Sequence, residues 1–147
     1  SVNRFVSQDL FSDRLLQYKY AYETFLQKPF FGFGLDKYAY INPELVPDYL
    51  KGHVVGAHNG YLSLLVQYGF IFGLFIIGII FYQTIQFYLR IEKEDSAQLT
   101  YLYIIIYAII ASFYESIMTG INEFHTVLFW FSFGFLSYSI YAKENAN

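Results

Sequence analysis

The sequence has no cysteine and little charge, and both shortages narrow the classes of protein to which it can belong. Without cysteine there is no disulfide, no thiol nucleophile and no thiolate metal ligand. Charged residues make up 14% of the chain, whereas an average soluble domain has about a quarter. The net charge of −3 comes with no basic stripe of the kind that nucleic acid requires. These shortages favour a membrane protein that does not bind nucleic acid.

Apolar residues are abundant, at 56% of the chain, and they are concentrated after residue 60. Three long runs there carry one charge at most, and they are residues 61–89, 99–118 and 124–142. Each approaches or exceeds the roughly 20 helical residues that cross a bilayer. The sequence therefore predicts an all-α integral membrane protein, in which a long loop (1–60) precedes a region of three transmembrane helices (61–147).

The chain begins at Ser1 in polar sequence, with no charged segment followed by an apolar one of the kind that forms a secretory leader. We therefore expect it to be a fragment of a larger polytopic protein. Its partners would then include missing N-terminal transmembrane helices of the same protein, as well as the lipid bilayer.

Residues 10–28 of the loop have the periodicity of an amphipathic helix that lies at the membrane interface. Its predicted apolar face consists of Phe11, Leu15, Tyr18, Tyr22, Phe25 and Leu26. Ser12 or Asp13 is the expected cap, and the helix should end before Pro29. Arg14 falls on the shoulder of the apolar face. From spacing alone, it is either an ordinary surface arginine or a cation directed sideways.

Glycine occurs in two informative pairs. Gly32 and Gly34 flank an aromatic residue and predict a tight turn that packs on the membrane surface, because one Gly-x-Gly is weak evidence for phosphate binding. Gly69 and Gly73 are four residues apart, which predicts close approach of another helix. The densest apolar sequence begins at Phe70, so the first two turns of the first span are expected at the interface.

Three further polar residues are candidates for function. His58 and Asn59 stand where polar sequence gives way to apolar sequence, and Asn59 can cap the first span. Glu115 is the one charge inside a predicted span, and ionisable residues there are functional candidates by default. By its position alone, His58 fits an interfacial histidine beside a helix cap better than a functional residue. For Glu115, a functional residue and a shallow carboxylate without function fit equally well. His53, in the loop, is expected to be solvated.

Several motifs, taken in order, resemble the C-terminal half of the O-antigen ligase and O-antigen polymerase superfamily. These are Arg14, Tyr18, Pro29-Phe30-Phe31-Gly32-Phe33-Gly34, His58-Asn59, Tyr61, Leu62, Leu65 and Gly69. Two positions depart from the family pattern. Tyr18 replaces the usual tryptophan, and Phe72 stands where the family has a small residue.

The resemblance implies a metal-independent glycosyltransferase of the cell membrane that needs no cofactor. Such enzymes move a glycan from undecaprenyl diphosphate onto an acceptor hydroxyl, and loop 1–60 would face outward. By this resemblance, His58 is the candidate catalytic base, because histidine titrates near neutral pH. Arg14 would bind the diphosphate, and Asn59, Tyr61 and Glu115 complete the predicted substrate-binding residues.

Two other classes of protein remain open. A transporter or flippase of a lipid-linked or small polar substrate would use an intramembrane charge, for which Glu115 is the candidate. A structural membrane subunit would explain the glycines and aromatic residues but leaves the His-Asn match to chance. The sequence does not separate a polymerase from a ligase, and loop charges do not determine which side of the membrane the loop faces.

Overall fold

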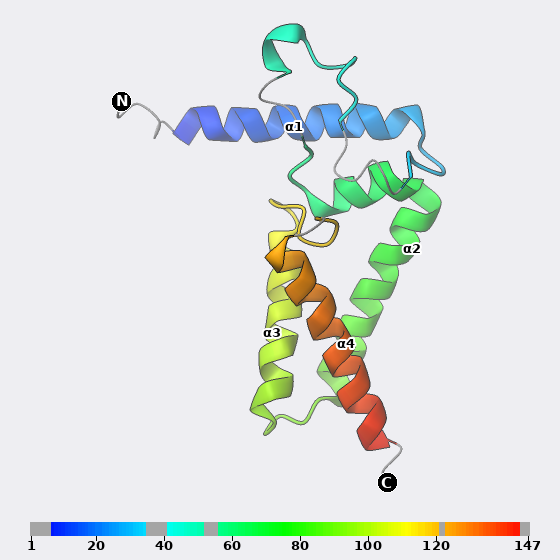
Figure 1. Cartoon of the computed structure of the whole chain (residues 1–147), viewed down its shortest axis with the longest axis vertical. Helices are drawn as coiled ribbons and strands as arrows, with labels where there is room; N and C mark the ends of the chain where they lie inside the picture. Colours follow the sequence, from blue (N-terminus) through cyan, green and yellow to red (C-terminus); the bar gives the residue numbers. More distant parts are fainter. Residues whose placement is uncertain (1–6, 35–40, 52–55, 121–122, 145–147) are drawn as a thin grey trace.

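The computed structural model describes residues 7–34, 41–51, 56–120 and 123–144, so His53 lies outside the described residues. Its four α-helices are α1 (Ser7–Gln27), α2 (Gly60–Arg90), α3 (Ser96–Ala111) and α4 (Phe124–Glu144), with a short 3-10 helix, η3, at Asp48–Leu50. The prediction of an all-α chain is confirmed. Figure 1 shows α1 lying across one end of the other three helices, which extend away from it as a group.

Helix α1 exists as predicted, but it starts at Ser7, so Ser12 and Asp13 lie inside it and do not cap it. The predicted apolar face packs against the protein only in part, at Phe25, which is buried. Leu15, Tyr22 and Leu26 of that face are each more than half exposed. The buried face instead includes Tyr20, Ala21 and Thr24, which pack under the loop that contains Ile41 and Val46.

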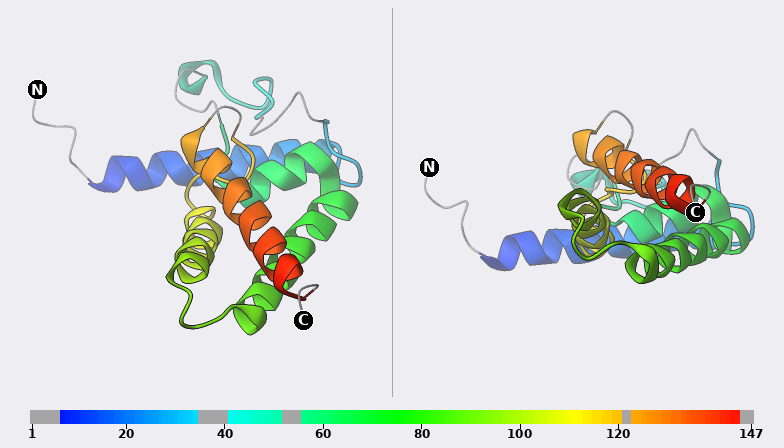
Figure 2. Two further views of the ribbon diagram at one scale, coloured as in Figure 1. Left: turned by 60° about the horizontal axis from the view of Figure 1, so that its bottom comes forward. Right: turned by 90° about the horizontal axis from the view of Figure 1, so that it is seen from below.

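Helix α2 is broken in two at Gly69, whose φ of 70° and ψ of −177° are not helical. This combination is essentially restricted to glycine, because a Cβ would clash with the backbone. The first part of α2 lies alongside α1, and the long part beginning at Phe70 turns away from it (Figures 1 and 2). The first two turns of the predicted span therefore run in a different direction from the rest of α2.

The turn at residues 29–34 supplies hydrogen-bond partners to the broken ends of α2. The amides of Phe33 and Gly34 donate to the carbonyls of Val66 and Gln67, both at 2.9 Å. The amide of Phe70 donates to the carbonyl of Pro29 at 2.6 Å. These bonds satisfy groups that a helix break otherwise leaves without partners.

Gly32 and Gly34 lie in the predicted tight turn, with φ values of 69° and 97°, but this turn packs on α2. A Cβ at Gly32 would overlap the backbone around Gln67 and Gly69, and a Cβ at Gly69 would overlap the backbone of Phe30 and Phe31. Gly73 faces Leu64 and Leu65 across the kink. The predicted helix–helix contact at Gly69 and Gly73 is wrong, because this surface closes on the turn and on α2 itself.

Helices α3 and α4 pack against each other, and together with α2 they enclose a core around Ile105, Phe129 and Leu136. The helix predicted at 99–118 is shorter than expected, since α3 ends at Ala111. Residues 112–120 form turns. Glu115 therefore lies in a turn beyond the end of α3 and not within a helix.

One described helix, α2, is both long and apolar enough to cross a membrane. Helix α3 is apolar but has 16 residues, fewer than the roughly 20 that span a hydrocarbon core. Length and composition thus support the first predicted span and leave the other two as predictions.

Candidate active site

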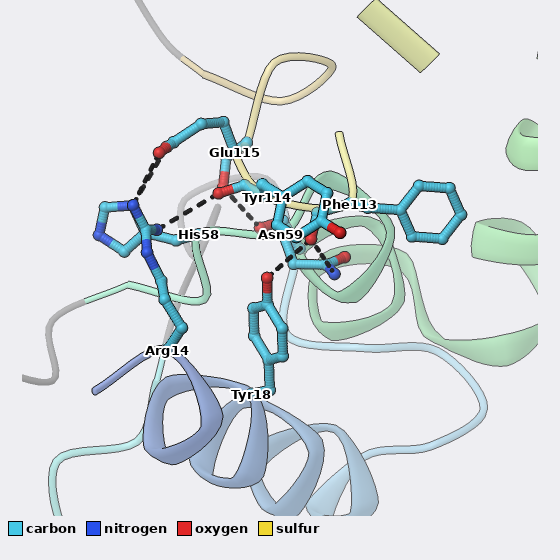
Figure 3. Close-up of polar contacts among 9 residues, drawn as sticks. Arg14, Tyr18, His58, Asn59, Phe113, Tyr114 and Glu115 are labelled. Carbon is cyan, nitrogen blue, oxygen red and sulfur yellow. Dashed lines mark hydrogen bonds and ion pairs between the residues drawn. The ribbon is translucent and has the colours of Figure 1, made fainter. Parts of the chain in front are cut away.

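The turn after α3 holds α1 and the start of α2 in place through its main-chain carbonyls. The carbonyls of residues 112–114, which follow the end of α3 at Ala111, accept hydrogen bonds from distant residues (Figure 3). The Ser112 carbonyl accepts from the Gly60 amide at 2.7 Å. The Phe113 carbonyl accepts from the Tyr18 hydroxyl at 2.7 Å and from the Asn59 side-chain amide at 3.0 Å. The Tyr114 carbonyl accepts from the Arg14 guanidinium at 3.3 Å.

His58 stands directly before α2 in an unusual backbone conformation. Its φ of 42° makes it the one residue other than glycine with positive φ among those described. Such a conformation costs about 1–3 kcal/mol and persists when neighbouring contacts impose it. Those contacts come from Asn59, whose side chain caps α2 by accepting from the Leu62 amide at 2.9 Å. The next residue, Gly60, is also fixed, because its amide donates to the carbonyls of Ser112 and Glu115.

Three charged or titratable side chains meet at this point. Glu115 contacts Arg14 through Oε1, at 2.8 Å from Nη2, and contacts His58 through Oε2, at 3.2 Å from Nδ1. Figure 3 shows the Glu115 carboxylate facing both the imidazole and the guanidinium, which overlap in this view. The residues come from α1, from the segment before α2 and from the turn after α3, so the fold assembles the cluster from three distant parts of the chain.

The Glu115 carboxylate is held in its ionised form. Burial raises the pKa of Glu115, but hydrogen bonds and positive charge from His58 and Arg14 outweigh this effect, so its pKa lies below the ordinary value. The side chains of Arg14, His58 and Glu115 are 39%, 43% and 52% exposed. Ion pairs this exposed contribute about 0–1 kcal/mol to stability, so the cluster adds little to the stability of the fold.

Arg14 and His58 retain hydrogen-bonding capacity. A guanidinium has five N–H donors, and the described part of the chain engages two of those on Arg14. The same described residues offer no partner for Nε2 of His58, whose side chain is partly exposed. The site thus presents a cation and an imidazole nitrogen that can both receive a ligand.

The remaining predicted site residue, Tyr61, lies deeper. Its hydroxyl donates to the Ile109 carbonyl at 2.8 Å, and its ring contacts that of Phe113. The sequence interpretation missed Ser63 and Ser116, whose hydroxyls are 3.2 Å apart. It also missed the contact between Tyr18 and Phe113. These pairs are roughly 50 to 100 residues apart, and no local pattern reports such contacts.

The position of Glu115 bears on the transporter alternative. That interpretation depended on a carboxylate within a membrane-spanning helix, whereas α3 ends at Ala111, four residues earlier in the sequence. The half-exposed carboxylate is committed to Arg14 and His58. Among the described residues, Glu115 therefore does not provide the intrahelical carboxylate on which the transporter interpretation depended.

Comparison with known proteins gives a family match for the segment that contains Arg14 and His58. A family model described as O-antigen ligase matches residues 1–78, slightly more than half of the 147 residues. This family is membrane-associated and acts on lipid-linked glycans. Comparisons with curated proteins and with solved structures give no match. The resemblance noted in the sequence is confirmed, and the chain belongs to the O-antigen ligase family.

Proposed function

We propose that this protein is a membrane glycosyltransferase that moves a glycan from undecaprenyl diphosphate onto an acceptor hydroxyl, as a polymerase or ligase of surface polysaccharide. The observation that carries the proposal is the cluster of His58, Glu115 and Arg14, with distances of 3.2 and 2.8 Å. His58 and Arg14 both lie in the segment matched to the O-antigen ligase family.

In the proposed reaction, the acceptor oxygen attacks the anomeric carbon of the donor glycan. The bond between that carbon and the diphosphate oxygen breaks, and the diphosphate leaves with the electron pair. His58 takes the proton of the acceptor hydroxyl, which is general-base catalysis. Arg14 stabilises the charge that develops on the diphosphate, since its planar fork binds two phosphate oxygens. Because the donor already carries a good leaving group, the proposed reaction requires no metal.

In the proposed membrane arrangement, α2, α3 and α4 cross the bilayer and α1 lies on its outer surface. The surfaces of these helices support this arrangement. Large exposed apolar side chains occur on α2 from Phe70 onward, on α3 and on α4, including Phe75, Tyr103, Ile110 and Phe131. A contiguous apolar surface of this kind marks contact with lipid or with other helices. The exposed stripe of Leu15, Tyr22 and Leu26 would let α1 rest on lipid.

The proposal is tested by replacing His58 with alanine in the full-length protein in its own cell and separating the surface polysaccharide on a gel. We expect long chains on the final acceptor to disappear, since a general base supplies about 10²- to 10⁴-fold in rate. His125→Ala is the matched control, because His125 is exposed at the start of α4 and takes no part in the cluster.

The gel pattern also separates the two activities. Accumulation of single lipid-linked repeat units identifies a polymerase, whereas long chains that stay on the lipid carrier identify a ligase. An unchanged pattern from a normally expressed His58→Ala protein would contradict the proposed function.

A further inference from the structure

Glu115 is the member of the cluster that lies outside residues 1–78, the segment matched to the family. We propose that Glu115 is a positioning residue that holds the proton on Nδ1 of His58, so that Nε2 is the nitrogen that receives the acceptor proton. The sequence had suggested that Glu115 binds substrate. In this inference it acts through His58 instead. This inference rests on the proposed function of His58 as the base.

The main chain of Glu115 is fixed relative to His58. The Glu115 carbonyl accepts a hydrogen bond from the Gly60 amide at 3.1 Å, and the Ser112 carbonyl accepts from the same amide at 2.7 Å. Gly60 is two residues from His58, so the imidazole and the carboxylate are attached to one hydrogen-bonded backbone unit. A Cβ at Gly60 would lie 3.1 Å from the Ser112 side chain, which indicates how closely the two segments approach.

The side chain of Glu115 is also held at both of its oxygens. Oε1 accepts from Arg14 at 2.8 Å, and Oε2 lies 3.2 Å from Nδ1 of His58. Arg14 is in turn bonded to the Tyr114 carbonyl at 3.3 Å. The carboxylate therefore cannot rotate away from the imidazole without losing its contact with Arg14.

The chemistry of these groups selects one tautomer of His58. An ionised carboxylate accepts hydrogen bonds and donates none, so the Nδ1 that faces Glu115 must carry a hydrogen. In a neutral imidazole the lone pair is then on Nε2. After Nε2 takes a proton, the imidazolium lies beside the carboxylate, and the two opposite charges stabilise each other. Glu115 thus prepares the base before the reaction and stabilises its charge afterwards.

The test uses Glu115→Gln in the full-length enzyme, with Glu44→Gln as a matched control. Glu44 is an exposed carboxylate in the loop after α1. The probe is lipid-linked glycan extracted from cells that lack the enzyme. We expect kcat to fall by about 10- to 100-fold, within the range that a general base supplies, with little change in KM for the donor. Glutamine keeps an oxygen for Arg14 but has no charge to stabilise the imidazolium. Glu115→Asp, which keeps the charge, should recover part of the kcat.

A second readout does not depend on activity. Nitrogen-15 NMR of histidine-labelled protein, with His58 assigned by its loss in His58→Gln, reports which ring nitrogen carries the hydrogen. We expect hydrogen on Nδ1 in the parent and a mixture of tautomers in Glu115→Gln. Hydrogen on Nε2 in the parent would overturn the inference, even if Glu115→Gln does not fold.

The results distinguish this inference from the proposed function. An inactive His58→Ala protein together with full kcat in Glu115→Gln overturns the role of Glu115 and leaves the function of His58 intact. An active His58→Ala protein overturns both.

Discussion

Replacement of Gly69 with alanine is expected to straighten or unfold the start of α2 and to abolish glycan transfer. Two penalties combine at this position. The backbone has a φ of 70° and a ψ of −177°, a conformation that costs a residue with a Cβ about 3 kcal/mol. The new methyl group would also overlap the backbone of Phe30 and Phe31, which cannot move without losing the hydrogen bonds to α2.

Gly78→Ala is the matched control for this prediction. Gly78 lies in the same helix, and a Cβ built there meets nothing within 4 Å. Alanine in a helix interior is favoured over glycine by about 1 kcal/mol, so Gly78→Ala should melt at the parental temperature or above it. Thermal unfolding in detergent and the transfer assay measure both variants. Equal melting temperatures for Gly69→Ala and Gly78→Ala would show that the kink does not require glycine.

Replacement of Arg14 with alanine is expected to lower kcat/KM for the lipid-linked donor by about 10³-fold, the upper range for removal of one group that stabilises transition-state charge. The variant loses the proposed contact with the diphosphate and also frees the Glu115 carboxylate, which Arg14 holds at 2.8 Å. Arg14→Lys should recover only part of this loss, because an ammonium lacks the planar fork that reaches two acceptors at once.

The control for Arg14 is Lys19→Ala on the same helix. Lys19 is exposed and pairs with Glu23 at 3.9 Å, one turn further along α1. Its removal takes away one positive charge without touching the cluster, so kcat/KM should stay near that of the parent. If the loss in Lys19→Ala equals that in Arg14→Ala, then general surface charge and not the position of Arg14 governs donor binding.

Local sequence was sufficient to predict the helices, because each rests on periodicity, a cap or an apolar run. Asn59 caps α2 as expected, and α1 ends before Pro29. The apolar face of α1 was predicted to lie at the membrane interface. Leu15 and Tyr22 of that face are exposed, while Tyr20 and Ala21 are buried in the protein. Periodicity identifies an apolar face but does not say whether protein or lipid covers it.

The two features that shape the site depend on contacts between distant segments, and no local pattern encodes them. The end of α3 was missed because Ile117 and Met118 continue the apolar run beyond it. The turn there is held by donors from Tyr18, Asn59 and Gly60. The kink at Gly69 likewise depends on amides and carbonyls of residues 29–34.

The candidate site was predictable in part. His58 and Arg14 were identified through the ordered motifs, and the structure brings both to one carboxylate. Glu115 was singled out as an intramembrane charge, whereas it lies in a turn beyond α3 and contacts Arg14 and His58. Its pairing with Arg14 spans 101 residues, and the single sequence carries no signal for it.

The central claim is that the imidazole of His58 is the base, and rescue of His58→Gly by free imidazole tests it most directly. Glycine suits the φ of 42° at this position, so the variant should fold and leave a space beside Glu115. We predict that glycan transfer by the purified full-length variant falls by about 10²- to 10⁴-fold and that added imidazole restores it in a saturable manner. Transfer at the parental rate without imidazole would contradict the account.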